Sequence, residues 1–249
     1  MKNEIERWWD EASEYYQEET KIPTKEAHYG PFSPNENALK LLGNVNKKRV
    51  LELGCGGGQC SIAFAKKGAL PTAIDISSKQ LEFAKKLASE NNVEVNFIKG
   101  NVENLKMLGD NYFDVVFSAL TLMYIKDLKK CFLEVKRVLK KGGTFVFSLE
   151  HPFYLLMSPK NNKIEESYYD TGKKIQKETW PDGSKHRFIF YKRKVSDIIN
   201  ELLDSGFELG SVTEPFEIKK RGERIWEEGY SMRLVKLIAP TIIFKVHKK

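Results

Sequence analysis

A glycine-rich turn carries the residues of this sequence best suited to chemistry: Glu52-Leu53-Gly54-Cys55-Gly56-Gly57-Gly58. Glycines let the backbone turn where a Cβ would block it, and they let a ligand lie against exposed amides at the start of the next helix. Gln59 stands where a dinucleotide fingerprint has its third glycine. The Glu52 carboxylate would repel a pyrophosphate and attract an ammonium group. The turn therefore predicts a nucleotide-like ligand with a free ammonium.

A second acidic residue follows the next expected strand. Pro71 to Asp75 is mostly apolar and ends in an aspartate, at the offset from the first glycine where such an acid accepts ribose hydroxyls. Ser77 and Gln80 already form a capping box for the helix that follows. Asp75 is therefore left available for a ligand.

The pattern Glu52-x-Gly54-x-Gly56-x-Gly58 resembles the first motif of the class I S-adenosylmethionine-dependent methyltransferases and is similar to their small-molecule branch. The resemblance covers about residues 36–150 well and the final elements more loosely. It implies S-adenosylmethionine as the cofactor, with S-adenosylhomocysteine as its product. The residues that it implies for cofactor binding are Glu52, Gly54, Cys55, Gly56, Asp75, Ile76, Gln80, Asn101, Val102, Ser118 and, on an N-terminal lid helix, Tyr16.

One position in this set departs from the family pattern. The family often has Gly-Asp-Ala/Val where this sequence reads Gly100-Asn101-Val102. The acid of that motif accepts a hydrogen bond from the adenine amine, and the next backbone amide meets the ring. The carbonyl oxygen of Asn101 can accept the same hydrogen bond.

His151 is the best general-base candidate in the sequence. It follows the expected strand Gly143 to Leu149 in the run Glu150-His151-Pro152-Phe153, and ligands of open α/β sheets bind beyond the carboxyl ends of the strands. Equally, His151 can be a turn residue held by Pro152. After the strand that ends near Ser118, neither the Asn/Asp-Pro-Pro-Tyr/Phe motif of nucleobase-amine methylation nor the Pro-Cys of pyrimidine methylation occurs.

Hydrophobic periodicity indicates the elements that position these residues. Strands and helices alternate from Arg49 onward. The expected fold is α/β: a Rossmann-like, seven-stranded, mostly parallel sheet with an antiparallel last strand in three α/β/α layers. An aromatic-faced helix is expected at the N-terminus, and one helix is expected to continue to Lys141 and stop before Gly142.

The chain is expected to form a single domain with four parts. Residues 1–34 hold the N-terminal lid helix and a loop, 36–150 the cofactor-binding core, 151–192 an inserted β-hairpin cap, and 193–249 the rest of the core. The hairpin signal is Pro181-Asp182-Gly183-Ser184 between two strand-like runs. The side chains expected to wall the substrate site are Tyr168, Tyr169, Trp180, Phe188 and Phe190.

Composition limits the partners. The chain has 41 basic and 34 acidic residues among 249, a net charge of +7. Part of the excess lies near the C-terminus, at Lys219, Lys220, Arg221, Arg224, Lys245, Lys248 and Lys249. Without a recognisable nucleic-acid module, this pattern favours a solvated face, so nucleic acid is not the expected partner.

Cysteine usage and hydropathy point to the cytoplasm. Cys55, Cys60 and Cys131 are odd in number and lack metal-ligand spacing, which predicts neither disulfides nor a bound metal. The N-terminal residues lack a signal-peptide pattern, and no apolar run reaches the ~18 residues of a membrane span. We expect a monomer or homodimer that acts on a small molecule without membrane association.

Four alternatives remain open beside methyl transfer to a small molecule. A nicotinamide dehydrogenase would share Asp75 and the glycine turn, although Glu52 and Gln59 argue against it. An RNA (tRNA) methyltransferase would use the basic C-terminal region. A protein methyltransferase and a non-catalytic module that binds S-adenosylmethionine are also compatible with the sequence.

Overall fold

The computed structural model describes residues 4–158, 160–179, 183, 185–217 and 230–249. Its helices are α1 (Glu4–Thr20), α2 (Glu36–Leu39), α3 (Gln59–Lys66), α4 (Ser78–Glu90), η1 (Leu122–Tyr124), α5 (Leu128–Val138), η2 (Tyr154–Leu156), α6 (Val195–Asp204) and α7 (Met232–Val235). Its strands are β1 (Arg49–Leu53), β2 (Leu70–Asp75), β3 (Asn96–Lys99), β4 (Phe113–Ala119), β5 (Leu139–Glu150), β6 (Gly172–Thr179), β7 (Lys185–Lys192), β8 (Phe207–Thr213) and β9 (Thr241–Lys248).

Within these residues, seven strands form one sheet in the order β3-β2-β1-β4-β5-β9-β8. The strands from β3 to β5 run parallel, and β9 is antiparallel to both of its neighbours. The predicted fold class, a Rossmann-like mostly parallel sheet with an antiparallel last strand, is confirmed. Because β1 to β5 are parallel, their carboxyl ends meet at one edge of the sheet, which is where ligands of such sheets bind.

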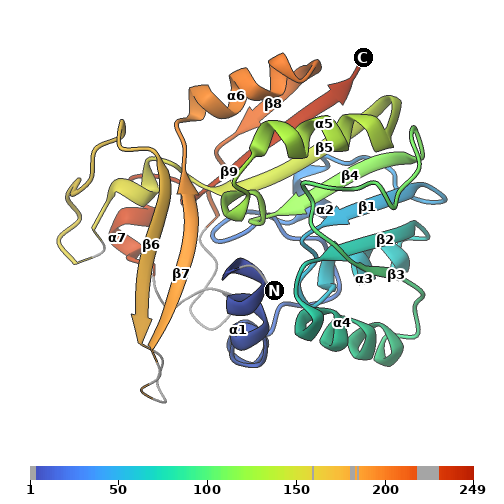
Figure 1. Ribbon diagram of the computed structural model, residues 1–249, viewed down its shortest axis with the longest axis horizontal. Coiled ribbons are helices and arrows are strands. Elements are labelled where there is room, and N and C mark those ends of the chain that lie inside the picture. The colour runs from blue at the N-terminus through green and yellow to red at the C-terminus, as the bar shows by residue number, and fades with distance from the viewer. Residues whose placement is uncertain (1–3, 159, 180–182, 184, 218–229) are drawn as a thin grey trace.

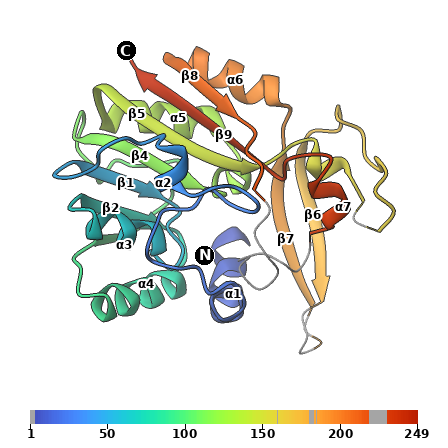
Figure 2. The same ribbon diagram turned by 180° about the vertical axis from the view of Figure 1, so that it is seen from behind.

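Each face of the sheet is covered by its own apolar cluster, which makes three layers (Figures 1 and 2). On one face, Leu51 and Val116 pack with side chains of α5 and α6. On the other face, their neighbours Val50 and Val115 pack with α3. Successive strand residues point to opposite faces, so neighbouring apolar residues of β1 and β4 serve both layers.

Helix α1 lies between the β6–β7 hairpin and the seven-stranded sheet with its flanking helices (Figures 1 and 2). On the core side, Asp10 Oδ1 accepts hydrogen bonds from Ser77 Oγ (2.7 Å) and Lys79 N (3.2 Å) at the start of α4. On the hairpin side, the Trp8 and Phe188 rings have their centroids 4.8 Å apart. The helix therefore bridges two parts of the fold that are distant in sequence.

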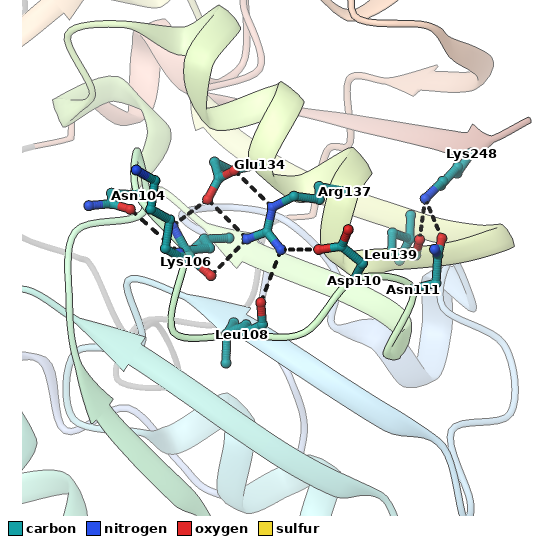
Figure 3. A network of polar contacts seen from close by, with 10 residues as sticks. Asn104, Lys106, Leu108, Asp110, Asn111, Glu134, Arg137, Leu139 and Lys248 are labelled. Atoms are coloured by element: carbon teal, nitrogen blue, oxygen red, sulfur yellow. Dashed lines mark hydrogen bonds and ion pairs between the residues drawn. The ribbon is translucent and has the colours of Figure 1, made fainter.

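Arg137, near the end of α5, holds the loop between β3 and β4 (Figure 3). Its guanidinium donates to the carbonyl oxygens of Leu105 (2.8 Å) and Leu108 (3.0 Å) and pairs with Glu134 at 3.0 Å. Glu134 in turn accepts a hydrogen bond from Leu105 N at 2.6 Å. This network anchors the loop whose first residues were predicted to contact the adenine ring.

The expected helix extension to Lys141 is wrong. Helix α5 ends at Val138, and β5 begins at Leu139. Leu139 is fully buried and pairs with Phe113 of β4, while Tyr112 N donates to Val138 O at 2.8 Å. Pairing with β4 therefore imposes an extended backbone where the local sequence alone favours a last helical turn.

The basic residues near the C-terminus are only partly described. Residues 219–221 and 224 lie outside the described residues. Lys248 on β9 donates to Asn111 Oδ1 and to the Leu139 carbonyl, both at 2.7 Å (Figure 3). Among the described helices, none has the length and apolar content that a bilayer crossing requires.

Candidate active site

A cavity of about 480 Å³ opens at the carboxyl edge of the sheet. It is lined from the carboxyl ends of successive parallel strands, by Glu52 near the end of β1, Asp75 at the end of β2, Gly100 after β3, Ala119 at the end of β4 and Glu150 at the end of β5. Helix α1 and strand β7 supply its cover through side chains that include Trp9, Tyr16, Gln17, Phe188 and Tyr191. The volume is in the range of small-molecule sites in proteins.

The glycine turn forms one wall of the cavity and requires glycine at its start. Gly54 has a φ of +64°, and a Cβ there would come within 2.1 Å of Thr121 Cγ2. Thr121 Oγ1 donates a hydrogen bond to the Gly54 carbonyl at 3.0 Å. The turn is therefore pressed against the loop after β4, and its backbone is left open on the cavity side.

Asp75 holds the glycine turn as well as lining the cavity. Its Oδ2 accepts a hydrogen bond from Gly56 N and its Oδ1 accepts one from Ser77 N, each at 2.8 Å. Burial raises the pKa of Asp75 to about 6, although these backbone donors act in the opposite direction. Each carboxylate oxygen keeps lone pairs that ligand hydroxyls can use.

Glu52 is almost fully buried behind the turn, with 3% of its surface exposed. Its Oε2 accepts a hydrogen bond from Ser61 Oγ of α3. Burial raises the pKa of Glu52 to about 8, with the Ser61 hydrogen bond opposing the shift. A ligand ammonium beside it would supply the positive charge that favours ionisation.

Three glutamine side chains connect α1 to the helices that follow the glycine turn and β2. Gln59 Nε2 donates to Gln17 Oε1 at 2.6 Å, and Gln17 Nε2 donates to Gln80 Oε1 at 2.8 Å. Gln80 Nε2 is buried and has no hydrogen-bond partner within the described ranges. Because Gln80 lines the cavity, this amide donor suits an acceptor group on a ligand, such as a carboxylate. Gln17 had no distinguishing signal in the sequence.

Asn101 and Val102 line the same cavity from the loop after β3. Asn101 Oδ1 accepts a hydrogen bond from Glu103 N at 2.9 Å, an Asx turn that orients the side chain. The oxygen retains a second lone pair for a ligand amine. Together with the glycine turn, Asp75 and Gln80, these residues fit the adenosyl and amino-acid parts of S-adenosylmethionine, which would supply a methyl group on a sulfonium.

The rest of the cavity is lined largely by aromatic and aliphatic side chains, with Glu4, Lys126 and Lys173 also in its lining. Trp9 lies with its ring centroid 5.4 Å from that of Tyr16 and 5.5 Å from that of Tyr124, and Tyr124 lies 5.2 Å from Phe188. Tyr191, Tyr230 and Glu150 also line the cavity. The cavity therefore joins a polar cradle at the strand ends to an aromatic compartment beneath α1 and the hairpin.

Most of the predicted cofactor residues line this cavity. They are Tyr16, Glu52, Gly54, Cys55, Gly56, Asp75, Ile76, Gln80, Asn101 and Val102. Ser118 is not among the lining residues: it is fully buried, and its Oγ donates to the Leu53 carbonyl at 3.0 Å. Its neighbour Ala119 faces the cavity instead.

His151 is likewise not among the lining residues. It is 2% exposed, and its Nδ1 accepts a hydrogen bond from Phe153 N at 3.1 Å. Nδ1 therefore carries no proton, so Nε2 carries it and donates to Glu214 Oε1 at 2.7 Å. In this arrangement neither ring nitrogen is available to an acceptor in the cavity, and the residue before it, Glu150, faces the cavity.

The expected substrate-wall residues separate in the structure. Phe188 lines the cavity, whereas Phe190 packs against the main core and Tyr169 is 83% exposed. Tyr168 stacks on Phe153 with a 4.5 Å centroid separation. Trp180 lies outside the described residues, as do Pro181, Asp182 and Ser184 of the expected hairpin turn, while the paired strands β6 and β7 bear out the hairpin itself.

Comparison with known proteins agrees with this geometry. A methyltransferase-domain family profile matches residues 51–147. A ubiquinone biosynthesis O-methyltransferase from Nitrosomonas europaea is 33% identical over 141 residues, which cover 57% of this chain and 56% of the relative. An uncharacterized protein from Haemophilus influenzae is 29% identical over 205 residues, 74% of this chain and 79% of that protein. The chain thus aligns with little more than half the length of the O-methyltransferase.

The structural matches cover more of the chain. An S-adenosylmethionine-dependent methyltransferase from Mesorhizobium loti is 27% identical with a TM-score of 0.67, over 85% of this chain and 96% of that one. A putative enzyme of the same kind from Listeria monocytogenes, 24% identical with a TM-score of 0.68 over 86% and 96% of the two chains, has the same fold. The strand order, the glycine turn and these relatives together support a class I S-adenosylmethionine-dependent methyltransferase.

Proposed function

We propose that this protein transfers a methyl group from S-adenosylmethionine to a small-molecule acceptor held in the aromatic compartment of the cavity. The observation that carries the proposal is that one cavity has both a polar part and an aromatic part. The polar half, at the ends of β1 to β3, suits the cofactor, and the aromatic half suits an apolar acceptor. Such a cavity can hold both molecules at once.

The chain's own residues act mainly by positioning. Glu52 would face the ammonium of the cofactor, Asp75 its ribose, and Asn101 with Val102 its adenine. Tyr16 and Trp9 would close the cavity from α1. Holding two reactants in near-attack geometry supplies much of the rate in such a transfer, because effective molarities of about 10⁵ M or more are attainable.

Enclosure supports an acceptor of limited size. Helix α1 and β7 cover the cavity, and α1 is fixed to the core through Asp10 and Gln17. A macromolecular acceptor would need to insert a nucleotide or side chain beneath this cover. The similar O-methyltransferases are named for ubiquinone biosynthesis, which is consistent with a small acceptor.

The test is label transfer. Purified protein is incubated with cell extract and S-adenosylmethionine labelled in its methyl group, and the labelled products are separated by size and identified by mass spectrometry. We expect the label in a small organic product. Label only in RNA or protein would contradict a small acceptor, and calorimetric binding of the cofactor without any label transfer would favour a non-catalytic binding module.

A further inference from the structure

Glu150 places a carboxyl group in the acceptor half of the cavity. It is the last residue of β5 and pairs with Thr241 of β9. The adjacent parallel strand β4 pairs Ala119 with Ser148 of β5, so the chain beyond Ala119 continues beside Glu150. Leu120 and Thr121 of that continuation line the same cavity, and Thr121 abuts Gly54 of the glycine turn. In the sheet, only β4 lies between β5, which carries Glu150, and β1, which leads into the glycine turn.

Tyr230 lines the same cavity as Glu150, and Tyr154 packs against Tyr230. The Tyr154 and Tyr230 rings have centroids 5.6 Å apart. The pKa values of both phenols are raised, mainly by burial and next by the negative charge of Glu150. In the part of the chain that the structure describes, no cation pairs with Glu150 and no donor hydrogen-bonds to it.

Burial brings the pKa of Glu150 into the range that suits proton transfer near neutral pH. Burial raises its pKa to about 7. A general base works best when its pKa lies near the operating pH. Because no described residue pairs with this carboxyl group and Glu150 lines the cavity, it is free to accept a hydrogen bond from a bound molecule.

We propose that Glu150 accepts the proton of the methyl acceptor, and that this acceptor is a small apolar molecule with a hydroxyl group, such as a phenol. The inference rests on the proposed function. The acceptor O–H bond breaks and its proton moves to a Glu150 oxygen while the acceptor oxygen bonds to the methyl carbon. The cofactor supplies that carbon from a sulfonium, and the electron pair of the broken carbon–sulfur bond stays on the sulfur. Glu150 then returns its proton to water.

Charge balance favours a hydroxyl over an ammonium at this position. The cofactor brings one positive charge near the acceptor, and Glu150 brings one negative charge. With a hydroxyl acceptor, both charges disappear as the methyl and the proton move, which a low-dielectric cavity favours. An amine bound in its ammonium form would add a second cation beside the sulfonium, and it would have to lose a proton before its nitrogen had a lone pair to attack the methyl carbon.

The experiment compares the wild type with Glu150→Gln and with the matched control Glu208→Gln. Glu208 lies on β8, is exposed and does not line the cavity. Two hydroxyl probes, para-cresol and benzyl alcohol, are tested with their amine counterparts, para-toluidine and benzylamine, using methyl-labelled cofactor. We expect methylation of a hydroxyl probe, and a kcat about 100-fold lower or more in Glu150→Gln. The rise of kcat with pH near 7 should be absent in that variant and present in Glu208→Gln.

A second measurement does not depend on turnover. In infrared difference spectra of the protein with S-adenosylhomocysteine, a protonated-carboxyl band should titrate near pH 7 in the wild type and be missing in Glu150→Gln. Adding para-cresol should lower this midpoint, because a hydrogen bond to the ionised form favours it.

Several outcomes would overturn the assignment of Glu150. They are methylation of amine probes alone, a kcat of Glu150→Gln within about threefold of the wild type, and a carboxyl midpoint that para-cresol leaves unmoved. If neither probe set is methylated, the assignment of Glu150 is judged by whether para-cresol lowers the midpoint of the carboxyl band. Failure of the wild type to bind S-adenosylmethionine in calorimetry would instead refute the proposed function.

Discussion

Replacing Glu52 with glutamine should make the protein's stability less sensitive to pH. Glu52 is 3% exposed, and burial raises its pKa from the ordinary value of 4.5 to about 8. The folded protein therefore keeps the proton on this carboxyl to a higher pH than the unfolded chain does. Its contribution to stability is complete below about pH 4.5 and is lost as the pH rises to about 8. Glutamine resembles the protonated acid in shape and does not titrate.

The size of the effect follows from the shift in pKa. A difference of about 3.5 units at 1.36 kcal/mol per unit gives about 5 kcal/mol as the upper limit. Local relaxation and water entry lower this figure, and part of the change lies below pH 5, so we expect Glu52→Gln to gain about 2–4 kcal/mol over the wild type between pH 5 and pH 8.5. For a chain of this size the gain corresponds to a Tm difference of the order of 10 °C.

The assay is urea unfolding of cofactor-free protein at a series of pH values from about 5 to about 8.5. Asp75 and Glu150 also titrate in this range, but they do so in both proteins and largely cancel in the difference. Glu208→Gln, an exposed carboxyl on β8, is the control and should differ from the wild type by a constant amount. If the free-energy difference between Glu52→Gln and the wild type also stays constant across this range, the argument from burial is refuted.

Three further substitutions test the parts of the site separately. Asp75→Ala should weaken S-adenosylmethionine binding at least about tenfold in calorimetry, because it removes both a ligand contact and the acceptor of Gly56 N; unchanged affinity would contradict the cofactor site. Gln17→Ala leaves two buried glutamines without partners, so faster amide hydrogen exchange in α1 and a loss of about 1–2 kcal/mol are expected, and unchanged exchange would show that other contacts hold α1. Arg137→Ala should lower the free energy of unfolding by about 1–3 kcal/mol in urea titration, since it removes the ion-pair partner of Glu134 and one donor to each of two loop carbonyls. A loss below about 0.5 kcal/mol would mean that the loop is held by other contacts.

Several features of the fold and site could be predicted from the sequence because they depend on short stretches of chain. The glycine turn after β1 needs conformations that glycine adopts readily, and Gly54 has a positive φ, as expected. The apolar strand before the turn and Asp75 after the next strand are equally local signals. Parallel pairing of β1 with β2 then brings their ends together, as the sequence pattern indicates.

Which side chains at the strand ends point into the cavity could not be predicted in the same way. Ser118 and His151 were selected by their place after apolar runs, but Ala119 and Glu150 line the cavity. Side chains alternate across a strand, so an error of one residue exchanges the buried side for the open side. Pairing with β9 and β4 sets this register, and those partners are distant in sequence.

Long-range contact also determined the cover of the cavity. The periodicity of the N-terminal helix predicted an aromatic face, yet the role of Gln17 depends on Gln59 and Gln80, which reach it only after α1 packs on α3 and α4. The local sequence therefore determined the cofactor turn and the alternation of strands and helices, since backbone preference and hydrophobic period act over a few residues. The acceptor half of the cavity was decided only by tertiary structure, because its lining comes from α1, β5, β7 and Tyr230, which no short-range preference brings together.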